Sequence, residues 1–311
     1  MIYANSDTNS DNSDNEIDNS SSEIEINSSG SSNSSSGGKI NSRIIIDDQN
    51  FQYISVKSKA FPISKEDYDI LYNYIVLKLF GTQELKHKQL KGSRKVYSAE
   101  NNKIVKISAM HGEIDSTSAD VIRNQACIKS TDQFVDIGSG IGSVCLFMAL
   151  TTGCEVVGIE IESSRYEISL VLQNSFDILL DELGIVRSPD QRLNHLARFI
   201  NCDFKDTVMI IERSTVVFFN DFGNATIQPE TRNCFYDKIM QLKDSSHVFV
   251  FETIQTKGFD VVGNYVLEAG TCSWTAKSLQ LRHYMRNREK DINITKVSCR
   301  ANKGQNSKFS F

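Results

Sequence analysis

The distribution of apolar residues divides the chain into two parts at about residue 43. Residues 4–38 are almost entirely Ser, Asn, Asp, Glu and Gly, with isoleucine as nearly the only apolar residue. Such a segment cannot bury enough apolar surface to offset the entropy of ordering. We therefore expect residues 1–42 to be a disordered tail and the folded part to begin with the short apolar run at 43–46.

The first regular periodicity predicts a helix that ends near Gly81. Its apolar positions recur at helical spacing, namely Tyr68, Leu71, Tyr72, Ile75 and Leu79. Residues 64–67 resemble a capping box in front of them. Residues 82–106 have few periodic apolar positions, which favours loops and short strands, and a second helix is expected over 117–128. Together these elements predict an N-terminal helical and mixed subdomain over residues 43–130.

From residue 131 onwards, short buried strands alternate with helices. The expected strands are 134–135, 155–160, 199–201, 216–220 and 248–252, and the expected helices are 144–150 and 229–242 together with a long one that ends at Gly184. The apolar face of that long helix is predicted to consist of Ile168, Val171, Leu172, Phe176, Leu179 and Leu183. This alternation predicts an α/β domain over residues 131–311 with a doubly wound, mostly parallel sheet. After Gly258 the strands follow one another without a full helix, so we expect an antiparallel element at the end.

The sharpest local signal is a glycine-rich turn between the first of these strands and its helix. It reads Asp136-Ile137-Gly138-Ser139-Gly140-Ile141-Gly142. Such a turn lets the backbone approach a nucleotide closely and points helix N–H groups at it. A dinucleotide site would need glycine at position 143, where this chain has serine. Asp136 would repel a pyrophosphate but suits a ligand with a sulfonium and an amino group, so the turn indicates S-adenosylmethionine.

Polar residues at the ends of the following strands extend this interpretation. Glu160 is placed to accept hydrogen bonds from ribose hydroxyls, and Asp203 with Phe204 is placed beside the adenine. Two alternatives remain open: a glycine loop with two incidental acids, and Asp203 as a helix cap. Asn220 follows the fourth strand, whose end faces the reacting methyl group. Neither proline of the amino-adenine DNA methylase motif follows Asn220, which argues against that chemistry.

Charge and cysteine content change the picture in two ways. The formal net charge is −5, but residues 1–42 hold seven acidic residues against Lys39 alone, so the acidity belongs to the tail. Basic residues gather at 78–106 and 282–311, which predicts either an electropositive face for a polyanion or solvated side chains on loops. The seven cysteines show no metal-binding spacing, so we expect no metal and reduced, buried thiols. No secretion signal or apolar run of membrane-spanning length is present, which predicts a soluble protein that does not enter a membrane.

These motifs resemble the disruptor-of-telomeric-silencing (DOT) family of histone-lysine methyltransferases, which lack a SET domain. The matching stretches are 134–142, 158–160, 202–204, 217–222 and 273–275, and His111-Gly112-Glu113 is similar to the family's Tyr-Gly-Glu loop. The resemblance implies a seven-stranded, Rossmann-like class I methyltransferase sheet. It also implies a nuclear enzyme that methylates a lysine on the nucleosome core face, on core histone three, and that grips DNA phosphates through 78–106 and 282–311.

By the same resemblance, S-adenosyl-L-methionine would be bound by His111, Glu113, Asp136, Gly138, Ser139, Gly140, Gly142, Glu160, Asp203 and Phe204. Asn220 would line the methyl-transfer site, and Phe222 and Trp274 would wall the lysine channel. The chain departs from the family at Asp221, Asn224, His111 and Leu281. Three hypotheses therefore stay open: a histone-lysine methyltransferase, a methyltransferase for another protein or RNA, and a cofactor- or chromatin-binding pseudoenzyme.

Overall fold

A computed structural model describes most of the chain after residue 41. The described residues are 42–47, 50–90, 94–100, 103–109, 112–220, 229–255, 257–273, 275 and 277–291. The predicted disordered tail, apart from Ser42, lies outside them. The described elements all belong to one unit that spans residues 39–311.

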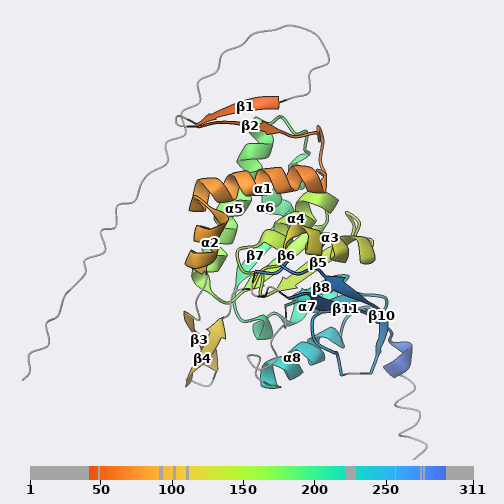
Figure 1. The fold of residues 1–311 in the computed structure, drawn as a ribbon. Helices are drawn as coiled ribbons and strands as arrows, with labels where there is room; N and C mark the ends of the chain where they lie inside the picture. The colour runs from red at the N-terminus through yellow and green to blue at the C-terminus, as the bar shows by residue number, and fades with distance from the viewer. Residues whose placement is uncertain are drawn as a thin grey trace, which may run out of the picture. The chain divides into compact units, whose positions relative to one another are not determined.

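A seven-stranded sheet forms the centre of this unit (Figure 1). Its strands are β5 Gln133–Ile137, β6 Glu155–Glu160, β7 Ala197–Asn201, β8 Val216–Phe219, β9 His247–Val250, β10 Phe259–Leu267 and β11 Leu279–Arg286. The spatial order is β10-β11-β9-β8-β5-β6-β7. Strands β5 to β9 pair in parallel, whereas β11 pairs antiparallel with both β9 and β10. The predicted doubly wound sheet with an antiparallel end is confirmed.

Helices cover both faces of the sheet. Figure 1 shows α1, α4, α5 and α6 on one side and α7 and α8 on the other. The helices of the sheet domain are α4 Ser143–Thr152, α5 Ser163–Glu182, α6 Leu193–Leu196, α7 Val208–Arg213 and α8 Pro229–Ile239, with 3-10 turns η1 Pro189–Gln191 and η2 Phe204–Asp206. Among the described helices, none is both long and apolar enough to cross a membrane.

The strands bury both of their faces, which explains why they appear in the sequence as continuous apolar runs. In β8, Val216 and Phe218 join the core beneath α4 and α5, whereas Val217 and Phe219 join the core beneath α7 and α8. Side chains alternate across a strand, so neighbouring residues must enter different cores. The sheet is therefore held by two hydrophobic layers.

The described N-terminal part adds three helices and two hairpins. These elements are α1 Lys65–Phe80, α2 Gln83–Leu90, α3 Ser116–Gln125, β1 Ser42–Asp47 with β2 Asn50–Ser55, and β3 Arg94–Glu100 with β4 Lys103–Ala109. Helices α1 and α3 pack on α4, and their apolar residues join the core that α4 and α5 bury. Two helices that precede the glycine turn in sequence therefore pack on the helix that follows it.

Helix α2 corrects the prediction of loops and strands at 82–106. The Thr82 hydroxyl accepts a hydrogen bond from the Leu85 N–H at 3.0 Å and so caps the helix. Lys86 and Leu90, one turn apart, are its buried positions in the described structure. Because one of the two is a lysine, no apolar periodicity marked this helix. The strands expected in the same region are present as β3 and β4.

Three further local predictions differ from the structure. Ser64 caps α1 as expected, but the Asp67 carboxylate accepts from the N–H groups of Lys57 and Ser58 instead of completing the capping box. The apolar periodicity predicts Val171 on the buried face of α5, but Val171 is 48% exposed. Cys127 was expected to be buried and is exposed, since it follows the end of α3 with a positive φ of 49°. Tertiary contacts decide each case, and the local pattern does not contain them.

Candidate functional site

The glycine-rich turn lies where the sheet changes direction of winding. Strand β5 lies between β6 and β8, and the carboxyl ends of these parallel strands meet at one edge. Ligands of open α/β sheets bind in the crevice at such a point. The turn joins β5 to α4, and Gly138 and Gly140 adopt φ values of 78° and 57°. The N–H groups of Gly138 and Ser139 both donate to the carbonyl of Ile159, at 2.8 and 3.0 Å, which ties the turn to β6.

Gly142 is required by packing as well as by conformation. Its φ is 83°, and a Cβ at this position would lie 2.6 Å from the ring of Phe199 on β7. The third glycine of such turns commonly permits close approach of helix and strand. Gly142 therefore faces Phe199 and allows α4 to approach the sheet closely.

Asp136, at the end of β5, is a buried carboxyl group with few partners. It is 3% exposed, and its Oδ2 accepts a weak hydrogen bond from the Cys145 thiol at 3.7 Å. Burial raises the pKa of Asp136 to about 7, the thiol opposes that shift, and the nearby Glu160 carboxylate adds to it. A carboxyl group in this environment is stabilised in its charged form by any cation that binds beside it.

Glu160, at the end of β6, holds the turn in place. Its Oε2 accepts from the Gly140 N–H at 2.8 Å, and its Oε1 accepts from the Glu162 N–H at 2.9 Å. Burial raises the pKa of Glu160, and the two backbone hydrogen bonds and the Arg165 guanidinium partly offset this. Because a carboxylate oxygen has two acceptor positions, Glu160 can hold the turn and also accept from a ligand hydroxyl.

Asn220 closes the opposite wall of a small pocket over the turn. Its Nδ2 donates to the carbonyl oxygen of Gly112 at 3.1 Å. The lining includes Glu113, Asp136, Gly138, Ser139, Gly140 and Asn220, which sequence reasoning had assigned to one site. Within the described structure, the buried Ser139 hydroxyl has no hydrogen-bond partner. The pocket volume is about 10 Å³, roughly one water, so a larger ligand requires the two walls to separate.

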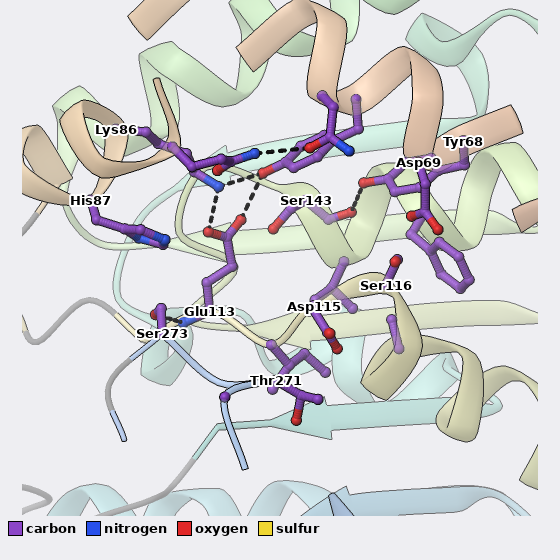
Figure 2. A pocket seen from close by; sticks show the side chains of 18 residues that line it. Tyr68, Asp69, Lys86, His87, Glu113, Asp115, Ser116, Ser143, Thr271 and Ser273 are labelled. Atoms are coloured by element: carbon purple, nitrogen blue, oxygen red, sulfur yellow. Dashed lines mark hydrogen bonds and ion pairs between the residues drawn. The ribbon is translucent and has the colours of Figure 1, made fainter. Parts of the chain in front are cut away.

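The wall formed by residues 112–113 is anchored from three directions. The Glu113 N–H donates to the Ser273 hydroxyl, and the Ser273 N–H donates to the Glu113 carbonyl, both at 2.9 Å. The Glu113 side chain projects into a second, larger cavity of about 370 Å³, where it meets Lys86 and Tyr72 (Figure 2). Sequence reasoning missed Tyr72 and Lys86 as site residues, since the tyrosine fitted a core periodicity and the lysine fitted a basic stretch.

Asp203 and Phe204 follow β7 and lie outside the lining of the small pocket. Asp203 caps η2 by accepting from the Lys205 N–H at 3.0 Å, which is the alternative that the sequence had left open. The Phe204 ring is buried and lies 5.7 Å from the ring of Phe219. Their predicted adenine contacts stay a prediction.

Several predicted residues lie outside the described structure. They are His111, Phe222 and Trp274, together with the departures Asp221 and Asn224. Leu281, which occupies the position expected for a channel tyrosine, is fully buried in the core beneath α4 and α5. In the described part of the chain, no three His, Cys, Asp or Glu side chains could hold a metal ion together.

The strand order, the glycine turn between β5 and α4 and the acidic residues at the ends of β5 and β6 define the fold of class I S-adenosylmethionine-dependent methyltransferases. Within this class, residues 94–285, more than half of the chain, match the family described as "Histone methylation protein DOT1". The chain belongs to this family, as its resemblance predicted.

Comparison with curated proteins agrees with the family. The chain is 28% identical over 196 residues to the "Histone-lysine N-methyltransferase, H3 lysine-79 specific" of Dictyostelium discoideum. The match covers 57% of this chain and 10% of that protein. It is 26% identical over 157 residues to the protein of the same name from Emericella nidulans, covering 50% of this chain and 29% of that one. The chain thus spans less than a third of the length of these relatives.

The solved structures that match the chain are more distant in sequence. An RNA methyltransferase from Salinibacter ruber, in complex with S-adenosyl-L-homocysteine, matches 55% of this chain and 91% of its own with 19% identity and a TM-score of 0.39. A putative RNA methyltransferase from Pyrococcus horikoshii matches 55% of this chain and 81% of its own with 11% identity and a TM-score of 0.40.

Proposed function

We propose that this protein is an S-adenosylmethionine-dependent histone-lysine N-methyltransferase that acts on core histone three in the nucleosome. The observation that carries the proposal is the set of groups around the glycine turn, in a chain whose family is that of histone methylation proteins. The two relatives are named as methyltransferases specific for lysine 79 of histone three. A nuclear location follows from a nucleosomal substrate.

The residues at the glycine turn fit the chemistry of the cofactor. Asp136 supplies a buried negative charge beside the turn, which suits a sulfonium and an ammonium group. The Ser139 hydroxyl lacks a partner in the described structure, and Glu160 has acceptor capacity left for ribose hydroxyls. The adenine would be contacted by Asp203 and Phe204 at the end of β7, and His111 would lie over the cofactor with Gly112 and Glu113.

The bound cofactor supplies a methyl group on a sulfonium centre. The chain must present to it an uncharged lysine amine, whose pKa in water is near 10.4. An apolar channel lowers that pKa by disfavouring the charged form, and we assign Phe222 and Trp274 to this channel. The Asn220 amide, at the end of β8, orients the reacting groups, and positioning accounts for most of the rate.

We further propose that basic residues contact nucleosomal DNA phosphates. Some basic side chains of 282–311 are already engaged within the fold, so fewer of them are candidates for phosphate contact. Arg282 and Arg286 donate to the main-chain carbonyls of Phe251, Gly258 and Met240. Arg288 donates to the carbonyls of Gln241 and Leu242, in the turn after α8, and Lys290 pairs with Asp260. Within 282–311, the proposal therefore rests chiefly on the four Lys and Arg residues at 292–311, and within 78–106 on exposed side chains such as Lys88.

The test is transfer of a labelled methyl group from S-adenosylmethionine to nucleosomes, free histones and RNA. We expect labelling of nucleosomes, with the label on histone three. Labelling of RNA or of another protein alone would replace the proposed substrate. Cofactor binding without labelling of any substrate would indicate a pseudoenzyme.

A further inference from the structure

The carboxylate of Glu113 points into the larger cavity, toward α1 and α2 (Figure 2). Its Oε2 lies 2.6 Å from the Lys86 ammonium nitrogen, and its Oε1 accepts from the Tyr72 hydroxyl at 2.9 Å. The Lys86 ammonium also donates to the Tyr72 oxygen at 2.6 Å and lies 4.9 Å from the centre of that ring. The three side chains form one connected polar network.

This network is buried. Lys86 is 2% exposed, and the side chain of Glu113 is 10% exposed. A buried ion pair adds little net stability, because desolvation of both charges cancels most of their attraction. Burial also removes Lys86 from contact with a phosphate, although it belongs to the basic stretch 78–106. The structural effect of the pair is to fix the position of Glu113.

The backbone attached to Glu113 is the wall that faces Asn220 across the small pocket. Gly112 accepts from Asn220, and Glu113 exchanges two hydrogen bonds with Ser273. The main chain of residues 112–113 is thus held from the sheet side, while its side chain is held by α1 and α2. The network and the sheet-side hydrogen bonds therefore hold the same two residues.

Helix α1 also contacts the glycine-turn side of the small pocket, through Tyr68, which lies one helical turn before Tyr72. The Tyr68 hydroxyl donates to the carbonyl of Ser143 at 2.9 Å, directly after Gly142. Tyr68 and Tyr72 are four residues apart, so they lie on one face of the helix, with their ring centroids 5.6 Å apart and the rings nearly parallel. One helix face therefore contacts both the glycine turn and the 112–113 wall.

We propose that Tyr72 and Lys86 are positioning residues for cofactor binding, which they promote by holding residues 112–113 through the Glu113 carboxylate. This inference rests on the proposed S-adenosylmethionine site. Neither residue lines the small pocket over the glycine turn. They raise cofactor affinity by pre-organising residues 112–113 for binding, and they do not act on the chemical step.

The test measures cofactor affinity by calorimetry for Lys86→Met and for Lys243→Met, which is a matched control at an exposed position outside both basic stretches. We expect Lys86→Met to weaken binding about tenfold or more, and Lys243→Met to change it by less than about twofold. At saturating cofactor, the kcat of Lys86→Met on nucleosomes stays within about threefold of the unchanged protein, because the network acts on binding. Equal affinity of Lys86→Met and the unchanged protein overturns the inference.

Two further variants separate positioning from loss of folding. Tyr72→Phe keeps the ring and removes only the hydroxyl, so it decides the question if Lys86→Met does not fold. We expect it to weaken binding about threefold or more, and unchanged affinity overturns the inference. The double variant Lys86→Met with Glu113→Gln removes both charges. The cofactor affinity of this double variant should remain low. Restored affinity would show that an unpaired buried charge alone weakened binding in Lys86→Met, and it would overturn the inference.

If the unchanged protein binds no cofactor at all, the proposed function fails first, which distinguishes that result from failure of the positioning role alone.

Discussion

The side-chain amide of Asn220, at the end of β8, donates a hydrogen bond to the carbonyl oxygen of Gly112, 3.1 Å away and 108 positions earlier in the chain. This bond joins the sheet edge to the wall that Lys86 and Tyr72 hold. The pocket beside this bond has a volume of about 10 Å³, roughly one water. We therefore expect a larger ligand to widen the pocket and to free the Asn220 amide for the reacting groups.

Asn220→Ala removes that amide, and we expect methyl transfer to nucleosomes to fall about a hundredfold or more. Cofactor affinity should change by less than about fivefold, since one neutral hydrogen bond is lost. Single-turnover transfer at saturating labelled cofactor measures the first quantity, and calorimetry measures the second. Asn264→Ala, on an exposed position of β10, is the control. Full activity of Asn220→Ala would remove it from the reacting site.

The pKa of Asp136 predicts a pH dependence of cofactor binding. Burial raises this pKa to about 7, so the carboxyl group is largely protonated at pH 6 and largely charged at pH 8. Only the charged form attracts a sulfonium or ammonium group. Cofactor affinity should therefore rise with pH across roughly this window, and binding should release a proton.

Calorimetry in two buffers with different ionisation heats measures both effects. Asp136→Asn should bind more weakly and without this pH dependence. The sign for stability is opposite to that for binding, because the folded-state pKa lies above the unfolded value. The contribution of Asp136 to stability without ligand is present at acid pH and is lost as pH rises toward and through about 7. A flat affinity profile in the unchanged protein would contradict this role.

The glycines of the turn should differ in their tolerance of a methyl group. A Cβ at Gly138 meets nothing within 4 Å, so Gly138→Ala should cost only the strain of its positive φ, about 1–2 kcal/mol. Gly142→Ala adds a clash with Phe199 and should cost about 3 kcal/mol or more in the free energy of unfolding. Urea denaturation measures both. Equal costs would mean that α4 and β7 separate easily.

The basic C-terminal end should contribute to nucleosome binding without supporting the fold. Truncation after Asp291 keeps β11, which pairs with both β9 and β10, so cofactor affinity and stability should be retained. Nucleosome affinity should fall, and the slope of its logarithm against that of salt concentration should flatten by about 0.9 for each DNA phosphate that the shortened chain no longer neutralises. Truncation before residue 282 removes most of β11 and is expected to unfold the sheet. An unchanged salt slope after the first truncation would assign these charges to solvent.

The sheet could be predicted closely because its strands are buried on both faces. A run such as 155–160 is then continuously apolar between polar ends, and β6 has these same bounds. The meeting of the glycine turn with the residues at the ends of β5 and β6 and directly after β8 could be predicted from the parallel topology. In a parallel sheet, strand ends share one edge, so residues far apart in sequence meet there.

The supports of the site could not be predicted in this way. Lys86 and Glu113 come from a helix and a loop, and no periodicity relates their positions. A lysine in a basic stretch favours a solvated interpretation until its burial is known. Hairpin β1–β2 shows the same limit, since the sequence marked the apolar run at 43–46 but not its partner over 50–55. Long-range partners of single polar residues leave no local pattern.

The anchoring of residues 112–113 also sets the smallest fragment of this chain that can retain the site. Its contacts come from Tyr72 on α1, Lys86 on α2, Asn220 after β8 and Ser273 between β10 and β11. Fragments that begin at the glycine turn, or that end after β9, would each lose part of this anchorage. A recombinant fragment for cofactor studies should therefore run from before α1 to the end of β11.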